Sequence, residues 1–92
     1  MSSEQEIIKL IEECKKGLNI PIETTALDGV LRQKLMAVKG YMVGAGVSEE
    51  KLDSDLAIGI IAMGVADLWE LKSGEVKFSP AFKIMLSQLA MG

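Results

Sequence analysis

Residues with side chains suited to catalysis are few and scattered along this chain. The sequence has 92 residues, no histidine and one cysteine, Cys14, so the commonest general base is missing and no disulfide can form within the chain. Cys14 shares a helical face with Ile7, Leu10 and Ile11, which indicates a packed thiol, and no histidine is present to activate it. A single cysteine also cannot build a zinc site.

Two pairs of carboxylates are the remaining candidates for chemistry. Asp53 and Asp55 could bind a cation, but the other ligands and the glycine of a calcium loop are absent, and helix capping explains these residues better. Asp67 and Glu70 lie about one helical turn apart and could act as an acid and a base. A polar edge on an otherwise apolar helix explains them more simply. We therefore expect no catalytic residue, no metal site and no cofactor.

Phosphate binding has weak support. Gly44, Ala45 and Gly46 lack the rest of either nucleotide-binding fingerprint. Arg32 and Lys39 are seven residues apart on one side of a predicted helix and could touch phosphate, although a solvated face is the commoner interpretation. The net charge of −3 argues against general binding of nucleic acid through its phosphates.

Hydrophobic periodicity predicts a single domain, residues 1–92, with an all-α fold: a small bundle of about four helices and one short extended loop. Serines and threonines before the apolar runs predict the helix starts. The candidate caps are Ser3, Thr24 or Thr25, Ser48, Asp53, Ser54 and Ser79. The expected segments are a first helix ending at Gly17, a second reaching about Val43, a short helical turn, a third from about Asp55 to Lys72, an extended stretch over 75–78, and a last helix from Pro80 to about Ala90.

The third helix is apolar around nearly its whole circumference between Asp55 and Asp67. Such a helix must be covered on all sides, and it is too short to cross a bilayer, which needs about 20 apolar residues. A chain of this size has few other elements to cover it, so we expect copies of the chain to cover one another. Two glycines inside it, Gly59 and Gly64, suggest that another backbone approaches closely.

Composition favours the same interpretation. Hydrophobic residues make up 49% of the chain, and its nine glycines raise the apolar fraction further. In typical soluble domains, apolar residues and glycine together make up only roughly 45–50%. The excess suits an oligomer interface, although a well-filled monomeric bundle remains an alternative. The stretch from Lys72 to Gly92 holds three lysines and one glutamate, whereas the rest of the chain has a net charge of −5. That asymmetry can suit head-to-tail contacts between unlike surfaces.

Several apolar or small residues lie off the main stripes of their helices. Exposed apolar residues on three helices together favour an extended contact surface. These candidate subunit-interface residues are Met36 and Val43 on the second helix, Gly59, Ala62 and Ala66 on the third, and Ile84 and Met91 on the last.

Three segments, Tyr41–Val47, Ala57–Trp69 and Ser73–Phe82, resemble the head–tail connector (adaptor) proteins of tailed bacteriophages and prophages, and the likeness extends from about Glu6 to Leu89. The resemblance implies a helical subunit that forms a homo-oligomeric ring below the portal, extends the DNA channel and docks the tail. It implies contact with portal and tail-completion proteins, no cofactor, no membrane, and a place in the virion after assembly in the host cytoplasm.

The resemblance also allows a contact with the DNA in the channel, one that does not depend on base sequence. The loop residues Glu75, Val76, Lys77 and Phe78 are candidates for a surface that faces the channel or the tail. A second hypothesis is a small cytoplasmic helical regulator or protein-binding module that acts as a dimer. A third, a DNA-binding accessory factor, is disfavoured by the acidic balance.

Overall fold

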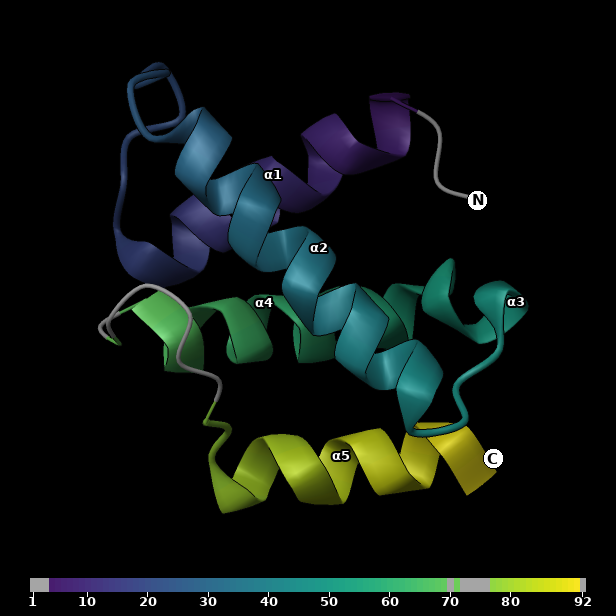
Figure 1. The fold of residues 1–92 in the computed structure, drawn as a ribbon. Coiled ribbons are helices and arrows are strands. Elements are labelled where there is room, and N and C mark those ends of the chain that lie inside the picture. The colour runs from purple at the N-terminus through teal and green to yellow at the C-terminus, as the bar shows by residue number, and fades with distance from the viewer. Residues whose placement is uncertain (1–3, 70, 72–76, 92) are drawn as a thin grey trace.

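The computed structural model describes residues 4–69, 71 and 77–91, and these residues form five helices (Figure 1). Four are long and one, α3, is a single turn. Their bounds are Glu4–Leu18 for α1, Asp28–Gly44 for α2, Glu49–Leu52 for α3, Asp55–Trp69 for α4 and Pro80–Met91 for α5. The predicted all-α bundle is confirmed. No helix in the described ranges is both long and apolar enough to cross a membrane.

Serine side chains begin three of the helices, as the sequence predicts. Each hydroxyl accepts a hydrogen bond from the backbone N–H three residues later, at 3.3 Å for Ser48, 3.3 Å for Ser54 and 3.2 Å for Ser79. These bonds satisfy N–H groups that have no partner inside the helix. Ser3, the predicted cap of the first helix, lies outside the described residues.

The second helix begins later than predicted. α2 starts at Asp28, after Leu27, which makes no side-chain capping bond, so the prediction of a start at Thr24 or Thr25 is wrong. The Thr24 N–H donates to the Pro21 carbonyl oxygen at 3.0 Å, and the Asp28 N–H donates to the Thr25 carbonyl oxygen at 3.1 Å. The two threonines therefore lie in consecutive turns that lead into the helix.

Residues with a positive φ angle end α1 and α2. Asn19 has φ 59° and Gly46 has φ 101°, a left-handed conformation that glycine and asparagine adopt most readily. The N–H of the following residue donates to the carbonyl five residues back, at 2.9 Å after Asn19 and 3.0 Å after Gly46. Gly46 thus ends its helix as predicted. Gly17, predicted to end the first helix, lies inside its last turn because the turn closes at Asn19.

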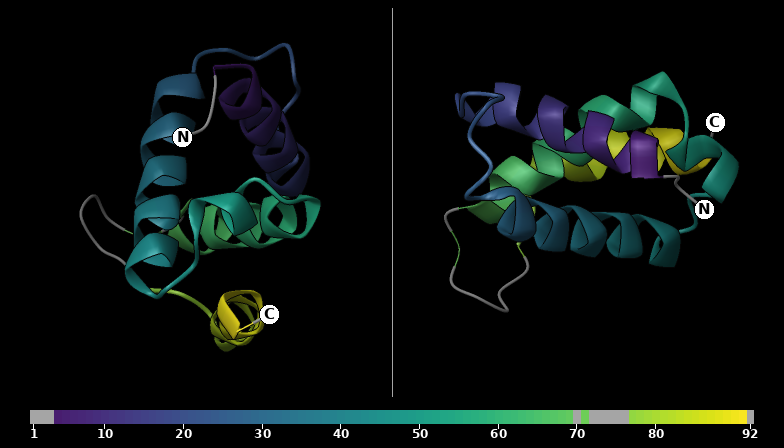
Figure 2. Two further views of the ribbon diagram at one scale, coloured as in Figure 1. Left: turned by 90° about the vertical axis from the view of Figure 1, so that its right-hand side faces the viewer. Right: turned by 90° about the horizontal axis from the view of Figure 1, so that it is seen from above.

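The chain itself covers most of α4. Helices α1, α2, α3 and α5 contact it, and α1 and α5 lie on opposite sides of it (Figures 1 and 2). Coverage by other copies, which the sequence led us to expect, is therefore not needed for the residues of α4 that its own chain buries. The residues of α4 that are buried within the chain are Ala57, Ile60, Ile61, Gly64, Val65 and Leu68.

Gly64 accounts for the close packing of α2 and α5 onto α4. A Cβ atom at this position would lie 2.7 Å from Cε1 of Phe82 and 2.8 Å from Cγ1 of Val38, both well inside contact distance. The neighbours are side chains of the same chain, not the backbone that the sequence suggested. A Cβ at Gly59 would meet nothing within 4 Å, so this second glycine is not needed for packing within the chain.

Polar contacts hold α5 at both of its ends. At its start, the Asp67 carboxylate of α4 accepts hydrogen bonds from the N–H and the hydroxyl of Ser79. At its end, the Lys51 ammonium donates to the Ala90 carbonyl oxygen at 3.1 Å. A cation at a helix C-terminus also interacts favourably with the helix dipole. The sequence predicted Asp67 only as part of a polar edge, and in the structure its carboxylate binds Ser79 at the start of α5.

A buried lysine joins α1 to the start of α2. Lys15 is 3% exposed, and its ammonium lies 2.7 Å from Oδ1 of Asp28 and 3.0 Å from the Ile22 carbonyl oxygen. A charge this well buried needs such partners to offset the loss of its hydration. The pair fixes the connector between the two helices, a role that the sequence did not reveal for Lys15.

Candidate functional site

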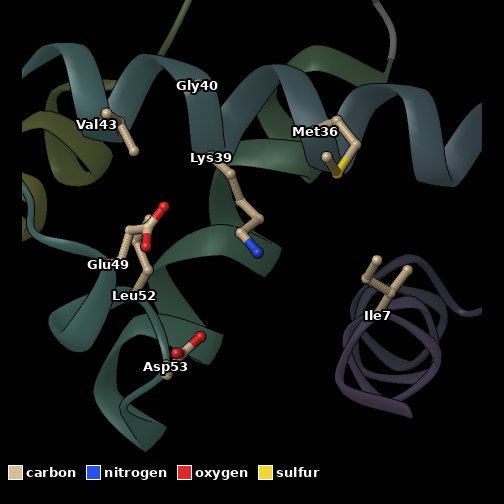
Figure 3. A pocket seen from close by; sticks show the side chains of 8 residues that line it. All are labelled: Ile7, Met36, Lys39, Gly40, Val43, Glu49, Leu52 and Asp53. Carbon is tan, nitrogen blue, oxygen red and sulfur yellow. The ribbon is translucent and has the colours of Figure 1, made fainter. Parts of the chain in front are cut away.

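The first exposed apolar surface lies on α2. Met36 and Val43 are 51% and 52% exposed, so the fold leaves about half of each side chain in solvent. They line a hollow of about 280 Å³ between α1, α2 and α3 (Figure 3). The buried side chains of Ile7 and Leu52 also line it. We call this hollow, with its lining residues, the α2 groove.

Charged side chains edge the α2 groove. In Figure 3 the Lys39 ammonium extends from α2, and the carboxylates of Glu49 and Asp53 come from the opposite wall. A second hollow of about 140 Å³ also includes Asp53 in its lining. The further charged residues that line this second hollow are Glu6, Lys9 and Asp55. Four carboxylates and two ammonium groups line the two hollows, so their combined lining is acidic.

The second exposed apolar surface is the outer face of α5. Ile84 is 59% exposed and Met91 is 87% exposed. At 100° per residue both point away from α4, because the residues that pack inward are Phe82, Leu86 and Leu89. We call Ile84 and Met91 the α5 stripe. It shares no residue with the α2 groove, so one small chain carries two unlike apolar surfaces.

The small face of α4 is partly uncovered. Gly59 and Ala66 are exposed, and Ala62 is half-buried against the core. The neighbouring Leu56 is 58% exposed. Gly59 and Ala66 are thus left open to solvent by the described part of the chain, whereas Ala62 is partly covered by it.

The prediction that Phe78 belongs to a loop facing the channel or the tail is wrong. This side chain is 6% exposed and stacks on Phe82, with ring centroids 4.3 Å apart and planes 21° apart. Tyr41 of α2 lies against it at 4.7 Å between centroids. Phe78 therefore anchors the segment before α5 to the core and does not face a partner. Lys77 is exposed, and Glu75 and Val76 lie outside the described residues.

Groups suited to catalysis do not converge in the described part of the chain. No set of three or more cysteine, aspartate or glutamate side chains there is arranged to hold a metal ion. Cys14 is buried, and its burial, with a smaller effect from the charge of Glu13, raises the pKa of its thiol to about 11. A thiol in this environment stays protonated and unreactive at neutral pH.

Arg32, considered above for phosphate, is paired within the chain. Its guanidinium lies on Glu4, with Nη2 and Oε1 2.5 Å apart and Nη1 and Oε2 3.4 Å apart. The hydrogen bond from Arg32, and then its charge, lower the pKa of Glu4, and the same pair raises the pKa of Arg32. Both side chains are solvent-exposed, so the pair joins the start of α1 to α2 at the surface.

The groove itself is what sequence reasoning missed. Met36 and Val43 were identified from their spacing, but the α1 and α3 residues that complete the hollow are distant in sequence from α2.

No protein-family model, no curated protein and no solved structure matches this chain.

Proposed function

We propose that this chain is a structural subunit that assembles into a homo-oligomeric ring, as in the head–tail connectors of tailed phages that its sequence resembles. The observation that carries the proposal is the pair of unlike apolar surfaces, the α2 groove and the α5 stripe, on one small chain. A ring forms when one face of a subunit binds a different face of the next and the rotation closes. Two such faces are the minimum that each subunit must provide.

The chemistry of the chain agrees with a protein that acts by contact. The thiol of Cys14 is buried and the carboxylate of Asp67 is engaged with Ser79. In the proposed role the ring extends the DNA channel below the portal and offers a platform for tail attachment, without cofactor and without catalysis. The acidic lining of the α2 groove and the neighbouring hollow suits contact with a protein better than contact with DNA.

The mass of the assembly in solution tests the ring. Sedimentation of the full chain over a wide concentration range should give one discrete species well above a dimer, and negative-stain microscopy of that species should show particles with an open centre. A clean dimer would instead favour the regulatory or protein-binding module. A chain that stays monomeric at millimolar concentration would end the ring proposal.

The viral role needs a separate test, in the genome that encodes the chain. Disruption of the gene should leave filled heads and free tails that do not join, and the intact gene supplied on a plasmid should restore complete particles. If complete particles form without the gene, the connector role is wrong, even where the purified chain forms rings.

A further inference from the structure

We propose that the α5 stripe of one subunit packs lengthwise and parallel into the α2 groove of the next, so that Ile84 covers Met36 and Met91 covers Val43. This inference rests on the proposed ring and assigns its two interface surfaces to each other. The occupant of the α2 groove is therefore a second copy of this chain.

The spacing of the two surfaces matches. Ile84 and Met91 are seven residues apart on α5, and Met36 and Val43 are seven residues apart on α2. At a rise of 1.5 Å per residue, each pair spans about 10.5 Å along its helix. Two stripes of equal length allow both contacts to form at once when the helices lie alongside each other, as ridges of one helix pack into grooves of another.

The side chains also suit each other in shape. The α2 groove is an open hollow of about 280 Å³, and Met91 is the most exposed of the large apolar side chains that the structure describes. Methionine is unbranched and flexible, so it fills irregular hollows well. A hollow beside the half-exposed Met36 and Val43 would thus be filled by a residue that its own chain leaves 87% exposed.

Charge favours this pairing over contact between two copies of α5. Lys83 is the single charged residue between Pro80 and Met91, and it is exposed next to Ile84. A contact of α5 with a second α5 would bring two such lysines together. Contact with the α2 groove instead brings Lys83 toward a lining in which two carboxylates, those of Glu49 and Asp53, outnumber the one ammonium group, that of Lys39. Complementary charges of this kind select the partner and the register of an interface.

Two single substitutions, Met36→Glu and Ile84→Glu, test the pairing. Each buries a charge in the proposed interface, so each variant alone should lose the large assembly, with self-association weakened by more than about tenfold. Met36→Glu keeps an intact α5 stripe and Ile84→Glu keeps an intact α2 groove. An equimolar mixture should therefore form a one-to-one pair and nothing larger, which native mass spectrometry would resolve.

The control is Ile8→Glu on α1. Ile8 is 52% exposed, matching Met36 and Val43, and it belongs to neither surface, so this variant should assemble like the unchanged chain. Circular dichroism should show the same helix content for all three variants because the substituted side chains are solvent-exposed.

Cysteine crosslinking gives a second measurement with smaller changes. A mixture of Val43→Cys and Met91→Cys should form a disulfide between unlike chains, and neither variant alone should crosslink. Cys14 is buried and should not react in the folded protein.

The outcomes separate the inference from the ring itself. If the unchanged chain assembles but Met36→Glu alone still forms pairs, if the mixed variants do not associate, or if like chains crosslink, the pairing is wrong and the ring stands. If Ile8→Glu also abolishes assembly, the effect is not specific to these two surfaces and the pairing is likewise wrong. If the unchanged chain remains monomeric, the ring and the pairing both fail.

Discussion

The Asp67 carboxylate accepts two hydrogen bonds from Ser79, one from its backbone N–H at 3.0 Å and one from its hydroxyl at 2.8 Å. The same hydroxyl oxygen accepts the N–H of Phe82 at 3.2 Å. A side chain of α4 thus positions the residue that begins α5. Together with the Lys51 contact at the other end of α5, it helps to fix the orientation of the α5 stripe relative to the rest of the molecule.

Removal of either partner should loosen α5. Asp67→Ala should lower the free energy of unfolding by about 1–3 kcal/mol, because it leaves partly buried donors unpaired. Ser79→Ala should cost about 1–2 kcal/mol through loss of the cap. The double variant should cost less than the sum, with a coupling of about 0.5–3 kcal/mol in urea denaturation.

The matched control for this cycle is Ser87→Ala, at an exposed position of α5, which should leave stability unchanged or slightly raised because alanine favours helix. Strict additivity of Asp67→Ala and Ser79→Ala would contradict the coupling.

The buried pair of Lys15 and Asp28 should respond asymmetrically to substitution. Asp28→Ala leaves the Lys15 ammonium with less compensation, and we expect a loss of about 1–2 kcal/mol in the free energy of unfolding. This is below the roughly 3–5 kcal/mol for fully buried pairs, because the Asp28 side chain is 39% exposed. Lys15→Met should cost less, because the Asp28 carboxylate that it leaves without its partner is partly exposed and can be hydrated, whereas Asp28→Ala leaves a buried ammonium. Thermal unfolding at low and high salt measures both, and a larger loss for Lys15→Met would overturn this account.

Local signals in the sequence were sufficient to predict most helix boundaries. Serine caps act on the backbone three residues away, and Gly46 ends α2 through its own φ angle, so these features depend on few neighbours. The start of α2 could not be predicted in this way. Its first residue, Asp28, contacts Lys15 across thirteen positions, and no local pattern distinguishes Asp28 from the threonines before it.

Burial of α4 and Phe78 depended on tertiary packing. The sequence indicated correctly that α4 must be covered, but not by which elements, because coverage depends on how closely neighbouring helices approach. Gly64 permits that approach by α2 and α5. The alternation around Phe78 indicated an extended segment, whereas contact with Phe82 and Tyr41 decided that this side chain is buried.

The candidate surfaces were predictable in part. Positions opposite a buried stripe are exposed, so helical spacing alone identified Met36, Val43, Ile84 and Met91. The hollow beside α2 was not predictable, because Ile7 and Leu52 reach it from helices on either side of α2 in the sequence. Their burial in the core gave them the ordinary pattern of interior residues.

Cys14 should be unreactive in the folded chain. Its thiol pKa of about 11 leaves little thiolate at pH 8, so labelling with a thiol reagent should be about two orders of magnitude slower than for an ordinary cysteine. In guanidinium chloride the rate should rise to the ordinary value. Spectrophotometric labelling in the two conditions checks this. Fast labelling of the native chain would show that α1 opens readily or that the thiol is not buried.

The Glu4–Arg32 pair should make the stability of the folded chain depend on pH in the acidic range. The pKa of Glu4 is below its ordinary value of 4.5 because Arg32 donates a hydrogen bond and carries a positive charge. Because the pKa of Glu4 is lower in the folded chain, the contribution of the pair to stability is fully present above pH 4.5. It is lost as the pH falls through the pKa of Glu4 in the folded chain.

Arg32→Gln should return the Glu4 pKa toward 4.5 in an NMR titration of the carboxyl carbon, and should leave the stability at pH 2 nearly unchanged. The effect at pH 7 should be small because both groups are exposed. An unchanged Glu4 titration in Arg32→Gln would show that the pair does not form in solution.

The two glycines of α4 should respond to alanine in opposite directions. Gly59→Ala adds a methyl group that meets nothing within 4 Å, so it should raise the free energy of unfolding by about 0.5–1 kcal/mol, the helix preference of alanine over glycine. Gly64→Ala places that methyl group against the rigid, fully buried Phe82 ring and against Val38, and the overpacking should cost about 1–3 kcal/mol. Chemical denaturation of the two variants is a matched comparison, since both substitutions lie in the same helix. Equal shifts of the same sign would contradict the packing of α2 and α5 around Gly64.

The substitution Gly59→Leu tests whether the face of α4 formed by Gly59, Ala62 and Ala66 lies in the subunit interface. If the variant still assembles, this face lies outside the interface. If assembly is lost while the helix content is unchanged, the face lies inside it.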